Sequence, residues 1–164
     1  MSDQKKRIVI IGGGPAGYEA ASAGAKYGAD ITLIEDQGMG GSGVILDCVP
    51  SKSFIAGANI KTDLRRADDL GLSDHLGDAD LAMAALNKRV LSLAGEQSGD
   101  IRSRMEEIGV RVVDGRGTFS ANQETHGATY NVVATKNDGS TEEIQADLVL
   151  VATGATPRIL PGAQ

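Results

Sequence analysis

Short, continuous apolar runs recur along the chain and are separated by longer segments with helical periodicity. Runs of four or five residues that are rich in β-branched side chains are typical of parallel strands covered on both faces. The sequence predicts four such strands, at residues 7–11, 31–34, 110–113 and 147–151.

Three helices are expected between these strands. The first is alanine-rich, covers residues 16–27 and stops at Gly28. The second opens at residues 50–52 and runs to about residue 66. The third covers residues 81–108 and ends at Gly109, with Gly95 and Gly99 as candidate points of bending or division. Its apolar residues recur mostly at steps of three or four and form one core-facing stripe, made of Leu86, Val90, Leu93, Ile101, Met105 and Ile108.

An antiparallel excursion is expected before the last parallel strand. It starts at residues 115–119 and continues with strands at 129–135 and 141–146, which the turn sequence Asn-Asp-Gly-Ser connects. These elements together predict an α/β fold of the Rossmann-like type, with a parallel sheet and an antiparallel β-meander excursion.

The composition is that of one globular domain. A length of 164 residues allows a sizeable core, and 22 glycines fit a sheet with many tight turns. No run of 18 apolar residues is present, so we expect no membrane span. A polar start that leads straight into a strand argues against a signal peptide, and the single cysteine excludes an internal disulfide. These features favour a cytoplasmic protein.

The charge pattern narrows the choice of partners. A net charge of −6 and a pI of about 4.9 argue against a nucleic-acid partner. Residues 61–80 are charged and poorly periodic, and we interpret them as a solvated connector. His75 within it has no carboxylate or thiol at ligand spacing, so we interpret it as a surface residue and expect no metal site.

A glycine motif follows the first strand without a gap. Gly12 allows the chain to turn sharply, Gly14 lets a pyrophosphate approach the backbone, and Gly17 allows the helix to pack closely on the sheet. Pro15 and Ala16 open the helix, whose N-terminus offers N–H groups and a positive dipole end to phosphates. The spacing predicts a dinucleotide site; the alternative is a glycine turn in an ordinary βαβ unit.

An acidic residue ends the second strand at the distance expected for such a site. Glu35 lies about 20 residues past the glycines, where a carboxylate binds ribose hydroxyls. Asp36 is the weaker candidate for the same role. The glycines that follow predict a flexible loop able to follow a ligand closely: Gly38, Gly40, Gly41 and Gly43.

Three segments occur in the order found in flavoprotein disulfide reductases: GGGPAGYEAA, GGSGVILDCVPSK and VATGATPRILP. The chain resembles this family over nearly its whole length. The resemblance implies that the first motif binds the ADP half of FAD, with Gly41, Ser42 and Lys52 of the second segment also at the cofactor. It further implies that the backbone near Gly117 meets the adenine, unless this is a plain strand glycine. It places Ala152, Thr153 and Gly154 at the pyrophosphate.

The second segment departs from the family pattern at its redox centre. The family normally has two cysteines there, and this chain has Gly43 at the first position and Cys48 at the second, next to the flavin. We favour Cys48 as a small packed residue over a redox thiol, because reactivity needs a lowered pKa. A persulfide or an intermolecular disulfide is a further alternative. The family places Lys52 near the flavin N5, where a cation stabilises reduced flavin.

The chain therefore resembles the NAD(P)H quinone reductases related to dihydrolipoamide dehydrogenase. This resemblance implies FAD as cofactor, NAD(P)H as cosubstrate of the full-length protein, and a small quinone as acceptor. Dihydrolipoamide dehydrogenase itself, a non-catalytic nucleotide-binding module and an NAD-dependent Rossmann dehydrogenase remain as alternatives. The choice between NADH and NADPH stays open.

The resemblance also predicts the domain organisation. Residues 1–156 are expected to be the first part of an FAD-binding domain, and residues 157–164, marked by Pro157 and Pro161, a linker toward an absent NAD(P)H-binding domain. A homodimer is expected at full length, and these residues alone are expected to be inactive. The family's catalytic histidine belongs to a later domain, so neither His75 nor His126 is assigned that role.

Overall fold

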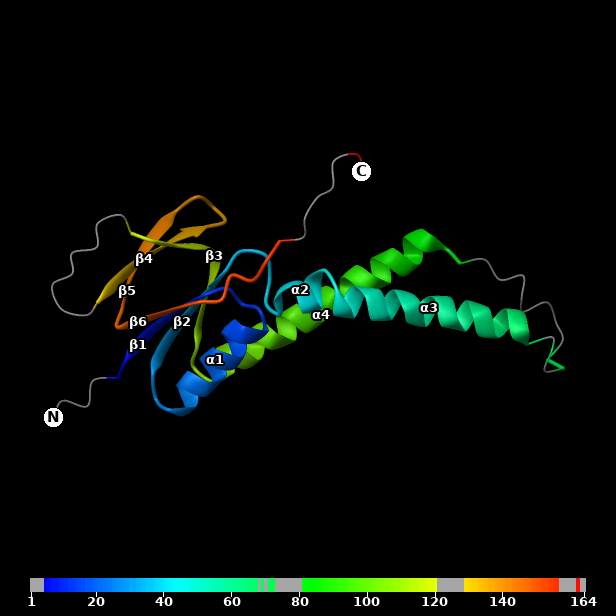
Figure 1. Ribbon diagram of the computed structural model, residues 1–164, viewed down its shortest axis with the longest axis horizontal. Coiled ribbons are helices and arrows are strands. Elements are labelled where there is room, and N and C mark those ends of the chain that lie inside the picture. The colour runs from blue at the N-terminus through cyan, green and yellow to red at the C-terminus, as the bar shows by residue number, and fades with distance from the viewer. Residues whose placement is uncertain are drawn as a thin grey trace.

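The computed structural model describes residues 5–67, 69, 71, 72, 81–120, 129–156 and 162. A six-stranded sheet of order β5-β4-β3-β2-β1-β6 forms the body of the molecule (Figure 1). Its strands are β1 Arg7–Ile11, β2 Asp30–Glu35, β3 Arg111–Phe119, β4 Tyr130–Lys136, β5 Thr141–Ala146 and β6 Leu148–Val151. The helices are α1 Pro15–Lys26, α2 Gly41–Ile45, α3 Cys48–Arg66 and α4 Met83–Glu107. The predicted α/β class is confirmed.

The four parallel strands explain the continuous apolar runs. β1 pairs with β2 on one side and with β6 on the other, and β2 pairs with β3. Alternate side chains enter two separate cores: Val9 and Ile11 lie in one, and Ile10 lies in the other. Both faces of the sheet are covered, so neither set of alternate positions has to be polar.

β3 is one strand where the sequence suggested two elements. Its first part pairs in parallel with β2, and its second part pairs antiparallel with β4. The strand also begins at Arg111 instead of Val110. Gly115 lies at the change of partner, where a Cβ atom would stand 2.4 Å from the Thr135 carbonyl oxygen. A glycine therefore allows the close approach of β4 that carries the strand from one pairing to the other without a break.

The β-meander covers one face of the parallel sheet. Its buried residues Val132, Ala134 and Ala146 pack against Val9, Ile11, Ile34 and Val113. Helices α1 and α4 cover the other face, where Ala21 and Met105 join the core. α4 runs through Gly95 and Gly99 without being divided, and the placing of Ile108 in the core-facing stripe was wrong, because Ile108 caps the helix and is 46% exposed.

The second glycine segment is more helical than expected. The loop predicted at residues 38–43 instead contains the start of α2, which the chain enters through Gly40 and Gly41 at φ values of 102° and 59°. α3 begins at Cys48, two residues before the predicted start. Pro50 causes no break because the first turn of a helix needs no N–H donor there.

Helices α3 and α4 lie along one another and extend away from the sheet (Figure 1). α3 continues to Arg66, so it includes the first residues of the connector predicted at 61–80. His75, His126, Pro157 and Pro161 lie outside the described residues. Within the part of the chain that the structure describes, no helix combines the length and apolar character needed to cross a bilayer.

An ion pair connects the start of β1 to the start of β6. The Arg7 main-chain N–H donates to Asp147 Oδ2 at 2.8 Å, and its guanidinium Nη2 donates to Oδ1 at 2.8 Å. The hydrogen bond from the Arg7 guanidinium makes the larger contribution and the Arg7 main-chain N–H the next, and they lower the pKa of Asp147 from 3.8 to about 2. The pair closes the β1–β6 edge at the end opposite the strand carboxyl termini.

We expect this pair to make stability depend on pH. Because the folded state lowers the pKa of Asp147, its contribution is present above about pH 4 and is lost as the pH falls toward about 2. Asp147→Asn should therefore lower the urea midpoint at pH 7, and the difference from wild type should shrink between pH 4 and pH 2. Asp63→Asn, at an exposed position on α3, is the control. A difference that stays constant down to pH 2 would contradict the assignment.

Candidate functional site

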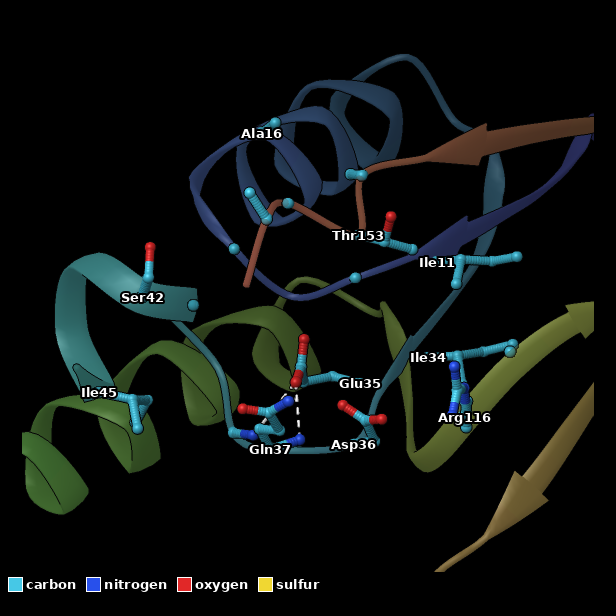
Figure 2. Close-up of a pocket in the computed structure, with 18 of the residues that line it drawn as sticks. Ile11, Ala16, Ile34, Glu35, Asp36, Gln37, Ser42, Ile45, Arg116 and Thr153 are labelled. Carbon is cyan, nitrogen blue, oxygen red and sulfur yellow. Dashed lines mark hydrogen bonds between the residues drawn. The ribbon is translucent and has the colours of Figure 1, made fainter. Parts of the chain in front are cut away.

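A cleft of about 790 Å³ lies at the carboxyl ends of the parallel strands (Figure 2). β1 lies between β2 and β6 in the sheet. The chain passes from β1 to β2 on one side, and it returns to the other side of β1 only at the end of the sheet, as β6. Open parallel sheets bind ligands at such switch points. The predicted residues that line the cleft are Gly12, Gly14, Pro15, Ala16, Glu35, Asp36, Gly41, Ser42, Gly117, Ala152, Thr153 and Gly154.

The turn after β1 depends on its glycines. Gly12 has a φ of 110°, and a Cβ atom on it would stand 2.3 Å from the Ala152 carbonyl oxygen. Gly14 is open to the cleft, because a Cβ on it would have only Gly41 Cα within 4 Å, at 3.8 Å. Gly17 does not line the cleft; a Cβ on it would stand 1.9 Å from the Gly12 carbonyl oxygen. Gly17 therefore allows α1 to pack against the Gly12 backbone, on the side of the turn away from the cleft. Gly14 forms the surface that a ligand would contact.

The start of α1 is open for an anion. No side chain caps the helix, and Pro15 occupies its first turn. The Gly14 carbonyl accepts the N–H of Tyr18, but among the described residues the N–H groups of Ala16 and Gly17 have no backbone acceptor. These groups and the positive end of the helix dipole are the elements that bind phosphates in nucleotide sites.

Glu35 holds the turn and the following loop together. Its Oε2 accepts the Gly13 N–H at 2.6 Å. Its Oε1 accepts the N–H groups of Gln37 at 2.7 Å and Gly38 at 3.3 Å (Figure 2). Asp36 beside it is exposed and lines the cleft. Glu35 therefore has a structural role in addition to the ribose contact that the sequence predicts, and this ribose contact remains a prediction.

The other walls come from distant segments of the chain. α2 contributes Gly41, Ser42 and Ile45, and a Cβ on Gly41 would stand 2.8 Å from Gly14 Cα, so the two glycine segments pack directly together. On the opposite side, Gly117 lies against Ile11 and Ile34 and leaves an apolar floor.

Ala152 to Gly154 follow β6 along the same edge of the sheet. The Ala152 N–H donates to the Ile11 carbonyl at 2.8 Å, and Gly154 turns the chain at a φ of 67°. This hydrogen bond fixes the segment beside the end of β1, so its backbone forms the wall of the cleft next to the glycine turn.

Besides Gly17, two further predicted residues are not brought into the cleft. Cys48 and Lys52 are exposed on the first turns of α3 and are not among the residues that line it. Sequence reasoning also missed several lining residues, among them Gln37, Ile45 and Arg116. The sequence could have indicated Arg116, because it lies between Gly115 and Gly117, and two glycines within a predicted strand suggest a close approach of backbone or ligand.

A parallel sheet with a glycine turn, an open helix start and an acid after the second strand defines a dinucleotide-binding α/β domain. The family model described as pyridine nucleotide-disulphide oxidoreductase matches residues 6–164. The chain belongs to this family. Members of the family use FAD and NAD(P)H.

Similar proteins carry two kinds of name. The chain is 49% identical over 162 residues to the NAD(P)H dehydrogenase (quinone) of Mycobacterium tuberculosis, and the match covers 96% of this chain and 32% of that protein. It is 30% identical over 157 residues to the dihydrolipoyl dehydrogenase of Chlorobaculum parvum, with 96% and 32% covered. The chain thus spans about a third of the length of the curated relatives it matches.

Solved structures agree with the fold. The crystal structure of LpdA from Mycobacterium tuberculosis matches with a TM-score of 0.85 and 46% identity, over 97% of this chain and 34% of that one. The HOCl-induced flavoprotein disulfide reductase RclA from Escherichia coli matches with a TM-score of 0.72 at 21% identity, over 96% of this chain and 30% of that one. The second likeness supports the fold alone.

Proposed function

We propose that this chain is the FAD-binding part of an NAD(P)H oxidoreductase that reduces quinone-type acceptors. The observation that carries the FAD assignment is the convergence of the Gly12–Gly14 turn, the start of α1, Glu35 and residues 152–154 on one cleft. Bound FAD would supply two-electron chemistry between a nicotinamide and the acceptor. Because the chain spans about a third of its relatives, turnover is proposed for the whole enzyme.

The residues present fit the ADP half of FAD. A volume of about 790 Å³ is within the range of cofactor sites. The start of α1 and the backbone at Gly14 suit a pyrophosphate, and Glu35 and Asp36 suit ribose hydroxyls. The apolar wall that Gly117 forms where it packs closely against Ile11 and Ile34 suits a flat base. The α3 residues Cys48 and Lys52 would then lie beyond this half, toward the flavin, as the family resemblance implies.

The single thiol supports a quinone-type acceptor over a dithiol. Gly43 stands where the family normally has its first cysteine, so within this segment Cys48 has no partner with which to form the family's redox disulfide. A relative at 49% identity is named as a quinone-reducing enzyme. Because other relatives are named dihydrolipoyl dehydrogenases, dihydrolipoamide oxidation is the second candidate function. The cytoplasmic location and the homodimer stay predictions.

The test is a comparison of wild type and Cys48→Ser in the whole enzyme that carries this chain. We expect NAD(P)H-dependent quinone reduction to change by about twofold or less, because no thiol takes part. Dihydrolipoamide-dependent NAD⁺ reduction should be absent in both proteins. A loss of about a hundredfold or more in Cys48→Ser, together with dihydrolipoamide turnover in wild type, would contradict the proposal and favour the second candidate. FAD bound without any turnover would leave a non-catalytic module.

A further inference from the structure

The segment that leads from β2 into α2 contacts the glycine turn after β1 at three points. The Gly13 N–H donates to Glu35 Oε2 at 2.6 Å, and the Gly13 carbonyl accepts the N–H of Gly40 at 2.8 Å. Met39 is 2% exposed and packs on the same glycine, because a Cβ on Gly13 would stand 2.7 Å from the Met39 sulfur. The position of this segment and the position of the turn therefore depend on each other.

A further contact joins the start of α2 to the surface that a ligand would meet. A Cβ on Gly41 would stand 2.8 Å from Gly14 Cα, and both glycines line the cleft. The φ values of Gly38, Gly40 and Gly41 are 128°, 102° and 59°, a path into α2 that residues with side chains rarely follow. A ligand bound at Gly14 would contact the turn and α2 together.

α3 follows α2 closely and is weakly held by the rest of the molecule. The N–H groups of Leu46 and Asp47, the two residues between these helices, donate to the Ser42 carbonyl of α2 at 2.9 and 2.7 Å. All 19 residues of α3 are described, and none of them is buried or lines the cleft. The helix extends away from the sheet beside α4 (Figure 1). Elements with so few buried contacts open locally at a low free energy.

We propose that residues 38–41 form a backbone link through which a nucleotide in the cleft stabilises α3, an element that the nucleotide does not touch. This inference rests on the proposed FAD site. A ligand that contacts both glycine segments binds best when α2 is in place, and by linkage it favours the state with α2 in place. Because α3 starts from α2, opening of α3 disturbs the contact of α2 with Gly14, and the bound ligand makes this opening rarer.

The link has a consequence for the far end of the site. Cys48 and Lys52 lie on the first turns of α3, and the proposed function places them toward the flavin. Binding of the ADP half of the cofactor would therefore also hold these two residues in place, although they are outside the cleft.

The experiment measures amide hydrogen exchange in the 164-residue chain by mass spectrometry, with and without saturating ADP. ADP is the probe because it lacks the flavin half and so reaches no residue of α3. Peptides from residues 49–60 of α3 should exchange about five- to a hundredfold more slowly with ADP, the range of coupling between two sites. Peptides from β4 and β5 report the stabilisation of the whole domain and show that ADP is bound.

Gly41→Ala tests the link itself. Its Cβ would push α2 away from Gly14, so at saturating ADP the slowing in α3 should fall to about twofold or less, while β4 and β5 still slow. Gly43→Ala is the matched control on the same helix. Gly43 does not have a positive φ, and a Cβ on it would meet nothing within 4 Å. This variant should keep the full slowing in α3.

The outcomes separate this inference from the proposed function. In wild type alone, α3 exchange that ADP leaves unchanged while β4 and β5 slow would overturn the link and leave the ADP site standing. Slowing in α3 that persists in Gly41→Ala would show that ADP stabilises the domain as a whole, and it would also overturn the link. A wild-type chain that binds neither ADP nor FAD would overturn both the link and the proposed site.

Discussion

Gly12→Ala is expected to destabilise the chain by about 2 to 5 kcal/mol and to abolish cofactor binding. At a φ of 110° an alanine is strained, and its Cβ would stand 2.3 Å from Ala152 O and 2.6 Å from Ala152 C. These are backbone atoms of the strand end that pairs with β1, so they cannot move without opening the β1–β6 edge. The urea midpoint and the FAD affinity of the chain measure the two effects.

Gly28→Ala is the matched control for backbone strain. Gly28 also has a positive φ, of 79°, but a Cβ on it would meet nothing within 4 Å. We expect this variant to lose about 1 to 2 kcal/mol and to keep its affinity for FAD. Equal losses of stability in Gly12→Ala and Gly28→Ala would show that contact with Ala152 is unimportant and would contradict the account of the turn.

Glu35→Ala is expected to weaken both stability and nucleotide binding. Removing the carboxylate leaves the N–H groups of Gly13, Gln37 and Gly38 without their acceptor, which costs about 1 to 3 kcal/mol. The affinity for ADP should fall about tenfold or more, because the turn loses its support and the ribose loses its acceptor. Thermal unfolding and an ADP titration check the two effects.

Asp36→Asn separates these two roles. Asp36 lines the same cleft and is exposed, and its carboxylate has no protein donor among the described residues. We expect its stability to stay within about 0.5 kcal/mol of wild type. If Asp36→Asn lowered stability as much as Glu35→Ala, the hydrogen bonds to Glu35 could not be the cause.

The sequence predicted the parallel sheet well because its strands are buried on both faces. Such strands have a short unbroken apolar run in the sequence, as at residues 7–11, and turn residues follow the run. The turn at residues 137–140 was also predictable from its Asn-Asp-Gly-Ser sequence. In the structure the Lys136 N–H donates to the Ser140 carbonyl at 2.8 Å, and Gly139 supplies a φ of 84°. Local chemistry decides both features.

The missed features depend on tertiary contacts. Nothing local distinguishes Gly115 as a point where a strand changes partner, because the reason is the distant Thr135 carbonyl. The helix at residues 41–45 was missed because the glycines at residues 38–43 indicate a loop, yet Gly40 and Gly41 form its entry and Gly41 packs on Gly14. The place of Arg116 in the cleft likewise follows from the tertiary pairing of β3, which at this residue is with Thr135 of β4.

The most direct test of the proposed FAD site is an equilibrium titration of the 164-residue chain with FAD, followed by competition with ADP. The account predicts one FAD bound per chain, displaced fully by ADP, with both affinities lowered in Glu35→Ala. Failure to bind FAD, or bound FAD that ADP does not displace, would contradict the assignment of the cleft to the ADP half of the cofactor.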